Sequence, residues 1–131
     1  MSVAPLMEFG YHHPSQKGAI AGELDILGVV TFVVFAEPDS PVRGTELFNR
    51  MMIAFGDDAK AIQGVWRKGS LPSINTDKVN ELTGKGASID NAVRHAWTVT
   101  RARKLGFAKV SVIHQDGSPG NFQKIDVLIE R

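Results

Sequence analysis

Histidine, arginine and threonine side chains gather in one stretch of this chain and are its clearest candidates for chemistry. Arg94, Thr98 and Arg101 follow one another at positions i, i+4 and i+7, a spacing that places them on one face of a helix. His95 lies at the margin of that face, and His114 follows near the end of the next apolar segment. Because histidine titrates near neutral pH and arginine stays charged, this set can transfer protons and hold an anion.

Such side chains suit acid–base chemistry on a phosphodiester. That reaction needs a group to take a 2′-hydroxyl proton, a group to protonate the leaving oxygen, and cations to stabilise the charge on phosphorus. We therefore expect a catalytic set of His95, Thr98, Arg101 and His114. The alternative for each is structural, since a histidine beside a tryptophan is often a boundary residue and arginines in a last helical turn complement the helix dipole.

Substrate binding would fall to a second set of cationic and aromatic side chains. Arg43 follows a proline-rich break, where a planar guanidinium can clamp a phosphate or simply be solvated. Trp66 precedes two cations, a pairing that can stack a base and hold its backbone, although tryptophan is also a common core residue. The expected binding residues are Arg43, Trp66, Lys68, Arg94 and Lys124.

Several other chemistries lack the residues they need. The phosphate-loop, dinucleotide-binding, zincin and nucleophile-elbow motifs are all missing from the sequence. The absence of cysteine removes thiol catalysis, disulfides and cysteine-ligated zinc. The acidic residues are scattered rather than clustered around a lysine. We therefore expect no metal and no cofactor.

The composition is that of one globular domain. The chain has 131 residues, with 43% hydrophobic and 22% charged residues. Its net charge of +1 is too balanced to indicate a nucleic-acid-binding protein by itself. The longest apolar run, Ile26–Ala36, is shorter than the roughly 20 residues that span a bilayer, so we expect no membrane insertion.

A long amphipathic helix over Ser88–Phe107 is expected to position the catalytic set. Ile89, Ala92, Val93, Ala96 and Trp97 form its apolar stripe, Ser88 can cap its first turn, and Gly106 ends it. The spacing predicts that Trp97 lies in the core.

The remaining patterns predict an α+β fold: a small, mostly antiparallel sheet carrying the long helix and two shorter helices, closed by a C-terminal β-hairpin. The shorter helices are expected over residues 44–56 and 75–82. Strands are expected at 24–35, 61–68, 108–114 and 122–129, with residues 115–121 as a flexible loop. Residues 1–22 have no sustained period and are predicted to be an arm or linker before a single domain at 23–131.

Several short motifs follow one another along the last two thirds of the chain. They are residues 43–49, Gly64–Trp66, Asn80 and Gly86–Ser88 leading to Ala96–Thr98, Gly106–Phe107 with Val110, and the closing hairpin. This part of the chain resembles the C-terminal toxin domains of bacterial polymorphic toxins, the variable tips carried by Rhs-type and contact-dependent inhibition proteins.

The resemblance implies a secreted or delivered effector that acts in the cytoplasm of a target cell and is blocked by a cognate immunity protein. Many such domains are ribonucleases with α+β folds, so RNA is the expected substrate and a metal-independent ribonuclease the expected activity. No paired-histidine or Glu–Arg–His set of such enzymes can be matched residue by residue.

Two other functions stay open at this point. An ADP-ribosyltransferase toxin would use Arg43 to grip a nicotinamide dinucleotide and Glu130 to act on the sugar, but the Ser-Thr-Ser element expected between them is missing. A non-enzymatic binding or immunity module would use its helices as an interface. An immunity protein against a nuclease ordinarily presents an acidic face, whereas residues 94–104 are basic.

Overall fold

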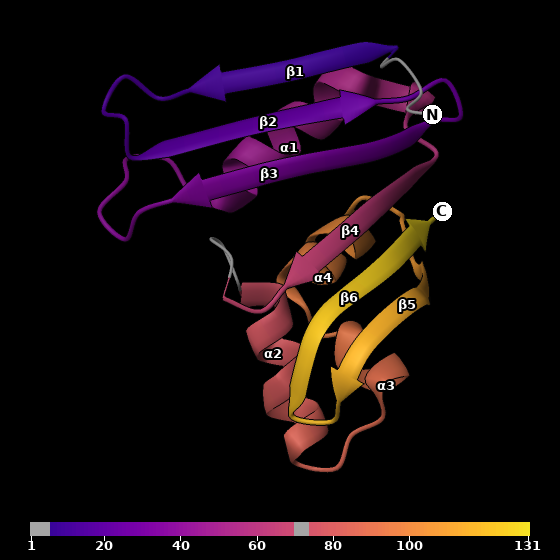
Figure 1. Cartoon of the computed structure of the whole chain (residues 1–131). Coiled ribbons are helices and arrows are strands. Elements are labelled where there is room, and N and C mark those ends of the chain that lie inside the picture. Colours follow the sequence, from indigo (N-terminus) through magenta and orange to yellow (C-terminus); the bar gives the residue numbers. More distant parts are fainter. Residues whose placement is uncertain (1–5, 70–73) are drawn as a thin grey trace. The chain divides into compact units, whose positions relative to one another are not determined.

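The computed structural model describes residues 6–69 and 74–131, which form an α+β protein as predicted. The chain divides into two compact units, Met1–Lys60 and Ala61–Arg131, called unit 1 and unit 2 below. Figure 1 shows the elements of both units.

Unit 1 is a three-stranded antiparallel meander with one helix. Strand β2 (Gly18–Leu24) pairs with β1 (Met7–His12) on one side and with β3 (Val29–Ala36) on the other. Helix α1 (Gly44–Phe55) packs on one face of this sheet (Figure 1). The helix is followed by a short 3₁₀ turn, Gly56–Asp58.

The core of unit 1 lies between α1 and the sheet. The buried stripe of α1 has the residues that its helical spacing predicts: Leu47, Phe48, Met51, Met52 and Phe55. Gly22 on β2 lies directly under this stripe, because a Cβ there would be 2.4 Å from the Met51 sulfur. The glycine therefore allows the helix to approach the middle of the sheet closely.

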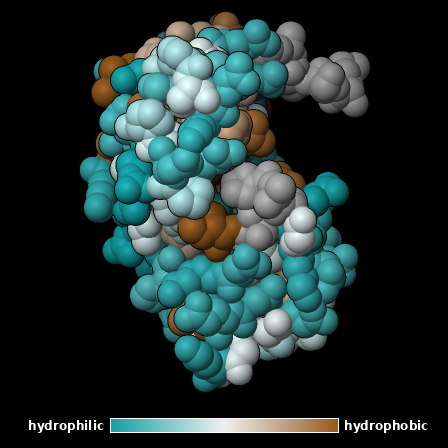
Figure 2. Space-filling model, turned by 90° about the vertical axis from the view of Figure 1, so that its left-hand side faces the viewer, coloured by the Kyte–Doolittle hydropathy of each residue, from teal (hydrophilic) through white to brown (hydrophobic). Residues whose placement is uncertain are grey.

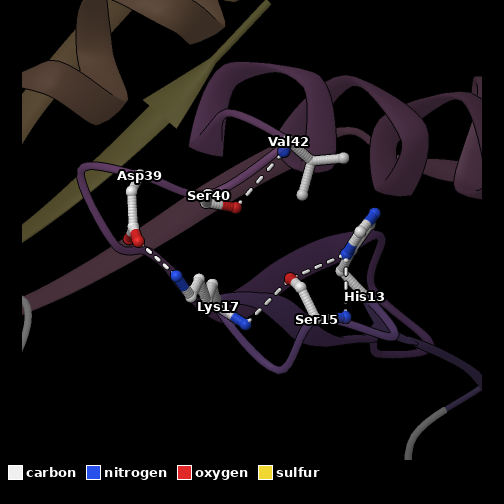
Figure 3. Close-up of polar contacts among 6 residues, drawn as sticks. All are labelled: His13, Ser15, Lys17, Asp39, Ser40 and Val42. Carbon is white, nitrogen blue, oxygen red and sulfur yellow. Dashed lines mark hydrogen bonds and ion pairs between the residues drawn. The ribbon is translucent and has the colours of Figure 1, made fainter.

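The turn between β1 and β2 is tied to the segment that precedes α1 (Figure 3). The Ser15 hydroxyl lies 2.8 Å from His13 Nδ1, and the backbone N–H of Lys17 donates to the same hydroxyl at 3.2 Å. The Lys17 ammonium forms an ion pair with Asp39. These contacts hold the turn in place and connect it to the chain that leads into the helix.

The expected N-terminal arm is ordered structure over its described part. Residues 7–22, expected to be arm or linker, form β1 and most of β2, while residues 1–5 lie outside the described residues. A boundary at residue 22 therefore falls inside a strand. β1 does alternate, with Met7, Phe9 and Tyr11 half-buried and Glu8, Gly10 and His12 exposed, so this strand was readable from the sequence. The alternation of β2 is harder to recognise because β2 faces the helix with Gly22 and the solvent with Ala21, which differ little in hydrophobicity.

Unit 2 contains three strands and three helices. Strand β6 (Asn121–Glu130) lies between β4 (Ala61–Arg67) and β5 (Lys109–Ser118) and is antiparallel to both. The helices are α2 (Ile74–Gly84), α3 (Ile89–Val93) and α4 (Trp97–Lys104). All three lie on one face of these strands (Figure 1), and the opposite face is called the outer face below. Figure 2 shows that hydrophilic side chains cover much of the surface in one view of the molecule.

The closing hairpin is fixed by helix α2. Strands β5 and β6 extend to Ser118 and Asn121, so the loop expected over residues 115–121 is mostly strand. The Asn80 side chain accepts from the Phe122 N–H at 2.7 Å and donates to the Phe122 carbonyl at 3.1 Å. The Thr83 hydroxyl accepts from the Gly120 N–H at 2.8 Å. These bonds replace the ladder partners that the end of the hairpin lacks.

The expected small, mostly antiparallel sheet with one long helix is corrected on two points. The described residues form a six-stranded mixed sheet rather than a small, mostly antiparallel one. The predicted helix over residues 88–107 is broken, because α3 ends at Val93 and Ala96 is extended, with φ −64° and ψ 147°. Ser88 does cap α3, since its hydroxyl accepts from the Asn91 N–H at 3.2 Å.

Candidate functional site

The break between α3 and α4 removes the helix face on which the predicted catalytic set depends. Arg94 and His95 lie in the connection between the two helices, and both are exposed. The i, i+4, i+7 relation of Arg94, Thr98 and Arg101 therefore no longer describes one surface. The structure does not bring these residues together as one site.

Thr98 has a structural position rather than a catalytic one. It is 3% exposed, and its hydroxyl accepts from Asn75 Nδ2 at 2.9 Å. Its N–H donates to Asn75 Oδ1 at 3.0 Å. Since Ala96 has no side chain that can cap α4, Asn75 supplies the cap from α2 instead.

Arg101 is also engaged within its own helix. Its guanidinium lies 5.6 Å from the centre of the Trp97 ring, and both residues are half-buried. Trp97 is therefore not in the fully buried core that the spacing predicts. The pair is a cation–π contact on the surface of α4.

Trp66 and Lys68, two of the predicted binding residues, are committed to the structure of unit 2. Trp66 is 8% exposed and packs over Gly64, where a Cβ would lie 2.6 Å from the indole nitrogen. Its side chain points to the helix side of the sheet with those of Ile62 and Ile125. The Lys68 ammonium donates to Asn121 Oδ1 at 2.7 Å. Trp66 is thus a core residue and offers no open ring to a base.

Arg43 is the one predicted binding residue that belongs to unit 1. It holds the N-cap position of α1 with an extended backbone, and its carbonyl accepts from the Leu47 N–H at 3.1 Å. Its side chain is exposed. The backbone of Arg43 therefore starts the helix while its guanidinium stays at the surface.

The outer face of unit 2 brings His114 next to a carboxylate. His114 on β5 pairs directly with Asp126 on β6, and Val65 on β4 occupies the other side of Asp126. This arrangement depends on a β-bulge at Ile113, which reverses the alternation of β5 after Val112. In a regular strand without the bulge, His114 would lie two residues after Val112 and share its helix-side face. Bulges commonly re-aim side chains in this way beside active sites.

The next row of the outer face carries two cations and a carboxylate. Lys124 on β6 lies between Arg67 on β4 and Asp116 on β5. The Lys124 ammonium is 3.6 Å from Asp126 Oδ2, which links this row to the row of His114. Arg67, Asp116 and His114 are exposed, and Lys124 is half-buried.

These two rows define the candidate site: His114, Asp116, Lys124, Asp126 and Arg67. His114 and Asp116 are two positions apart on one strand, which separates them by roughly 7 Å along β5. Lys124 lies beside both of them on the neighbouring strand. Asp126 Oδ1 is buried and has no hydrogen-bond partner among the described residues, while Oδ2 holds the lysine. A phosphate over Lys124 would have Asp116 beside it, His114 diagonally beyond on the same strand, and Arg67 on the opposite side.

The sequence identified His114 and Lys124 and offered Arg67 as one of the two cations after Trp66, but it missed Asp116 and Asp126. Asp116 lies in the segment predicted to be a flexible loop, and Asp126 and Arg67 alternate with apolar residues in strands whose open face was not recognised. The bulge leaves no plain signal in the sequence. The alternation of charges along residues 122–130 was the one indication that this strand has a polar face.

No family model, no curated protein and no solved structure matches this chain. Within residues 6–69 and 74–131, no helix is long and apolar enough to cross a membrane. The same residues contain no group of three or more His, Cys, Asp or Glu side chains placed to share a metal ion.

Proposed function

We propose that this protein is a ribonuclease that cleaves RNA by acid–base transesterification on the outer face of unit 2, without a metal ion. The observation that carries the proposal is the bulge at Ile113, which aligns His114 with Asp126, Asp116 and Lys124 on that face. A titratable imidazole, an exposed carboxylate and two cations are the groups that this reaction requires.

The reaction follows from the order of these side chains along the strands. The Asp116 carboxylate takes the proton of a 2′-hydroxyl, and the 2′ oxygen attacks the adjacent phosphorus. The bond from phosphorus to the 5′ oxygen breaks as protonated His114 donates a proton to that oxygen. The products are a 2′,3′-cyclic phosphate and a free 5′-hydroxyl.

The two cations have a different task from the acid–base pair. Lys124 and Arg67 stabilise the negative charge that grows on the phosphate oxygens in the transition state. Asp126 is a positioning residue, because its Oδ2 atom lies 3.6 Å from the Lys124 ammonium. DNA is not a substrate in this scheme, since it has no 2′-hydroxyl.

The resemblance of residues 43–131 to polymorphic-toxin tips supports a biological role for this activity. In that role the protein is an effector delivered into the cytoplasm of a competing cell, and a cognate immunity protein protects the producer. An immunity protein would cover the outer face of unit 2, because blocking that face prevents RNA from reaching His114.

Induced expression in a bacterial host tests the proposal. The wild-type chain is expected to arrest growth and to degrade total RNA while total DNA stays intact. His114→Ala is expected to restore growth and RNA integrity. His95→Ala is the matched control, because it removes the same side chain from an exposed position on the helix side of unit 2. Growth arrest by the His114→Ala variant, or arrest with intact RNA, would refute the proposed activity.

A further inference from the structure

Strand β1 is an outer strand of unit 1 with a row of backbone groups directed away from its neighbour. It has one strand partner, β2, among the described residues (Figure 1). The His13 N–H donates to the Gly18 carbonyl at 2.9 Å, which fixes the direction of hydrogen bonding at the end of the pair. Because that direction alternates, Glu8, Gly10 and His12 direct their N–H and carbonyl groups outward.

This edge is complementary to itself. If a second β1 lies antiparallel to the first with Gly10 opposite the partner's Gly10, the outward groups of Glu8 face those of the partner's His12. All three outward residues of each copy then have partners, and the arrangement has a two-fold axis through the glycines. Self-complementarity of this kind is what a symmetric dimer interface requires.

The side chains on both faces of the strand favour the same register. Glu8 would lie opposite the partner's His12 on the open face, where an imidazole N–H can donate a hydrogen bond to the Glu8 carboxylate, whose neighbour within its own copy is Glu23. On the helix face, Phe9 would lie opposite the partner's Tyr11. Both aromatic residues are half-buried in unit 1 alone, where Phe9 contacts the Phe55 ring edge-on and the Arg50 guanidinium lies 4.7 Å from the centre of the Tyr11 ring.

Within residues 7–12, strand β1 has few of the features that keep edge strands apart. Its sequence, MEFGYH, contains no lysine, no proline and no bulge, whereas β5 in unit 2 is interrupted by its bulge and carries Lys109 and Asp116. Natural sheets ordinarily protect an edge by one of these devices. A self-complementary edge with so little protection is what a strand that pairs with a second copy of the chain would present.

We propose that two copies of this chain form a symmetric dimer by antiparallel pairing of β1 with β1 of the second copy. Sedimentation equilibrium of the full chain tests this from about 1 μM to about 1 mM, the range of dissociation constants of weak interfaces. The wild-type protein is expected to approach twice its 14.2 kDa mass within that range. A single 14.2 kDa species at every concentration would overturn the proposal.

Charge substitutions identify the surface that associates. Glu8→Lys is expected to weaken dimerisation at least tenfold, because it replaces the carboxylate that accepts from the partner's His12 with an ammonium group that cannot accept a hydrogen bond. It leaves the fold intact, since the introduced ammonium would face the Glu23 carboxylate within the same copy. Adding His12→Glu to Glu8→Lys is expected to restore the dimer by placing a carboxylate opposite the introduced ammonium of the partner.

Glu23→Lys is the matched control, because it makes the same change one strand away from the edge. It is expected to change the dissociation constant less than threefold. Equal weakening by Glu8→Lys and Glu23→Lys would show that β1 is not the interface. Failure of the double variant Glu8→Lys with His12→Glu to restore association would show the same. The proposal does not depend on the ribonuclease activity, so each can fail alone.

Discussion

Replacement of Asn75 by alanine is expected to destabilise unit 2 through the N-terminus of α4. Asn75 makes two hydrogen bonds to Thr98, one to its N–H and one to its hydroxyl. Loss of a helix cap costs about 1 kcal/mol. Thr98 is 3% exposed, so water cannot replace the lost partners, and leaving its polar groups unpaired adds roughly 1–3 kcal/mol. The expected loss in free energy of unfolding is therefore about 2–4 kcal/mol.

Urea unfolding followed by tryptophan fluorescence measures this loss directly. Both tryptophans of the chain, Trp66 and Trp97, belong to unit 2, so the signal reports on the affected unit. Asn75→Asp is expected to lose less than about 1 kcal/mol, because a carboxylate can accept from both the N–H and the hydroxyl of Thr98.

Asn91→Ala is the control for the same substitution at an exposed helical site, and a change within about 0.5 kcal/mol is expected. The capping account is refuted if Asn75→Ala behaves like Asn91→Ala, or if Asn75→Asp is as damaging as Asn75→Ala.

Two further predictions concern the packing of unit 2. Gly64→Ala is expected to lower the free energy of unfolding by about 1–3 kcal/mol, because its Cβ would lie 2.6 Å from the Trp66 indole nitrogen. Gly84→Ala is the control, because its Cβ meets only ordinary van der Waals contacts. Equal effects of the two substitutions in urea unfolding would contradict the close packing of Gly64 against Trp66. Phe107→Ala is expected to cost about 3–5 kcal/mol, since Phe107 is 1% exposed, and Trp97→Ala clearly less. A larger loss in free energy of unfolding for Trp97→Ala than for Phe107→Ala would show that Trp97 is a core residue after all.

The sequence was sufficient to predict elements in which large apolar residues alternate regularly with polar ones. Helix α1 has the predicted buried stripe because large apolar residues recur at helical spacing between Gly44 and Gly56. The closing hairpin alternates apolar and polar side chains and was also predicted. Strand β1 was missed although Met7, Phe9 and Tyr11 recur at strand spacing. Strand β2 was missed because glycine and alanine take the place of large residues at its centre, where Met51 of α1 packs against Gly22.

The candidate site shows which contacts a sequence pattern cannot reveal. The broken helix depends on Asn75, which caps α4 from 23 residues away in the chain. The placement of His114 depends on one extra residue in β5. Local spacing therefore predicted the wrong face for Thr98 and Arg101, whereas His114 and Lys124 were identified by residue type and grouped only by the register of β5 and β6.

Cleavage of a defined RNA oligonucleotide in the presence of EDTA tests the central claim most directly. The wild-type protein is expected to release fragments that end in a 2′,3′-cyclic phosphate, identified by mass. His114→Ala is expected to lower kcat/KM by about 10²–10⁴-fold, and His95→Ala by less than about threefold. Loss of cleavage in His95→Ala but not in His114→Ala, or cleavage that disappears when EDTA is added, would contradict the account.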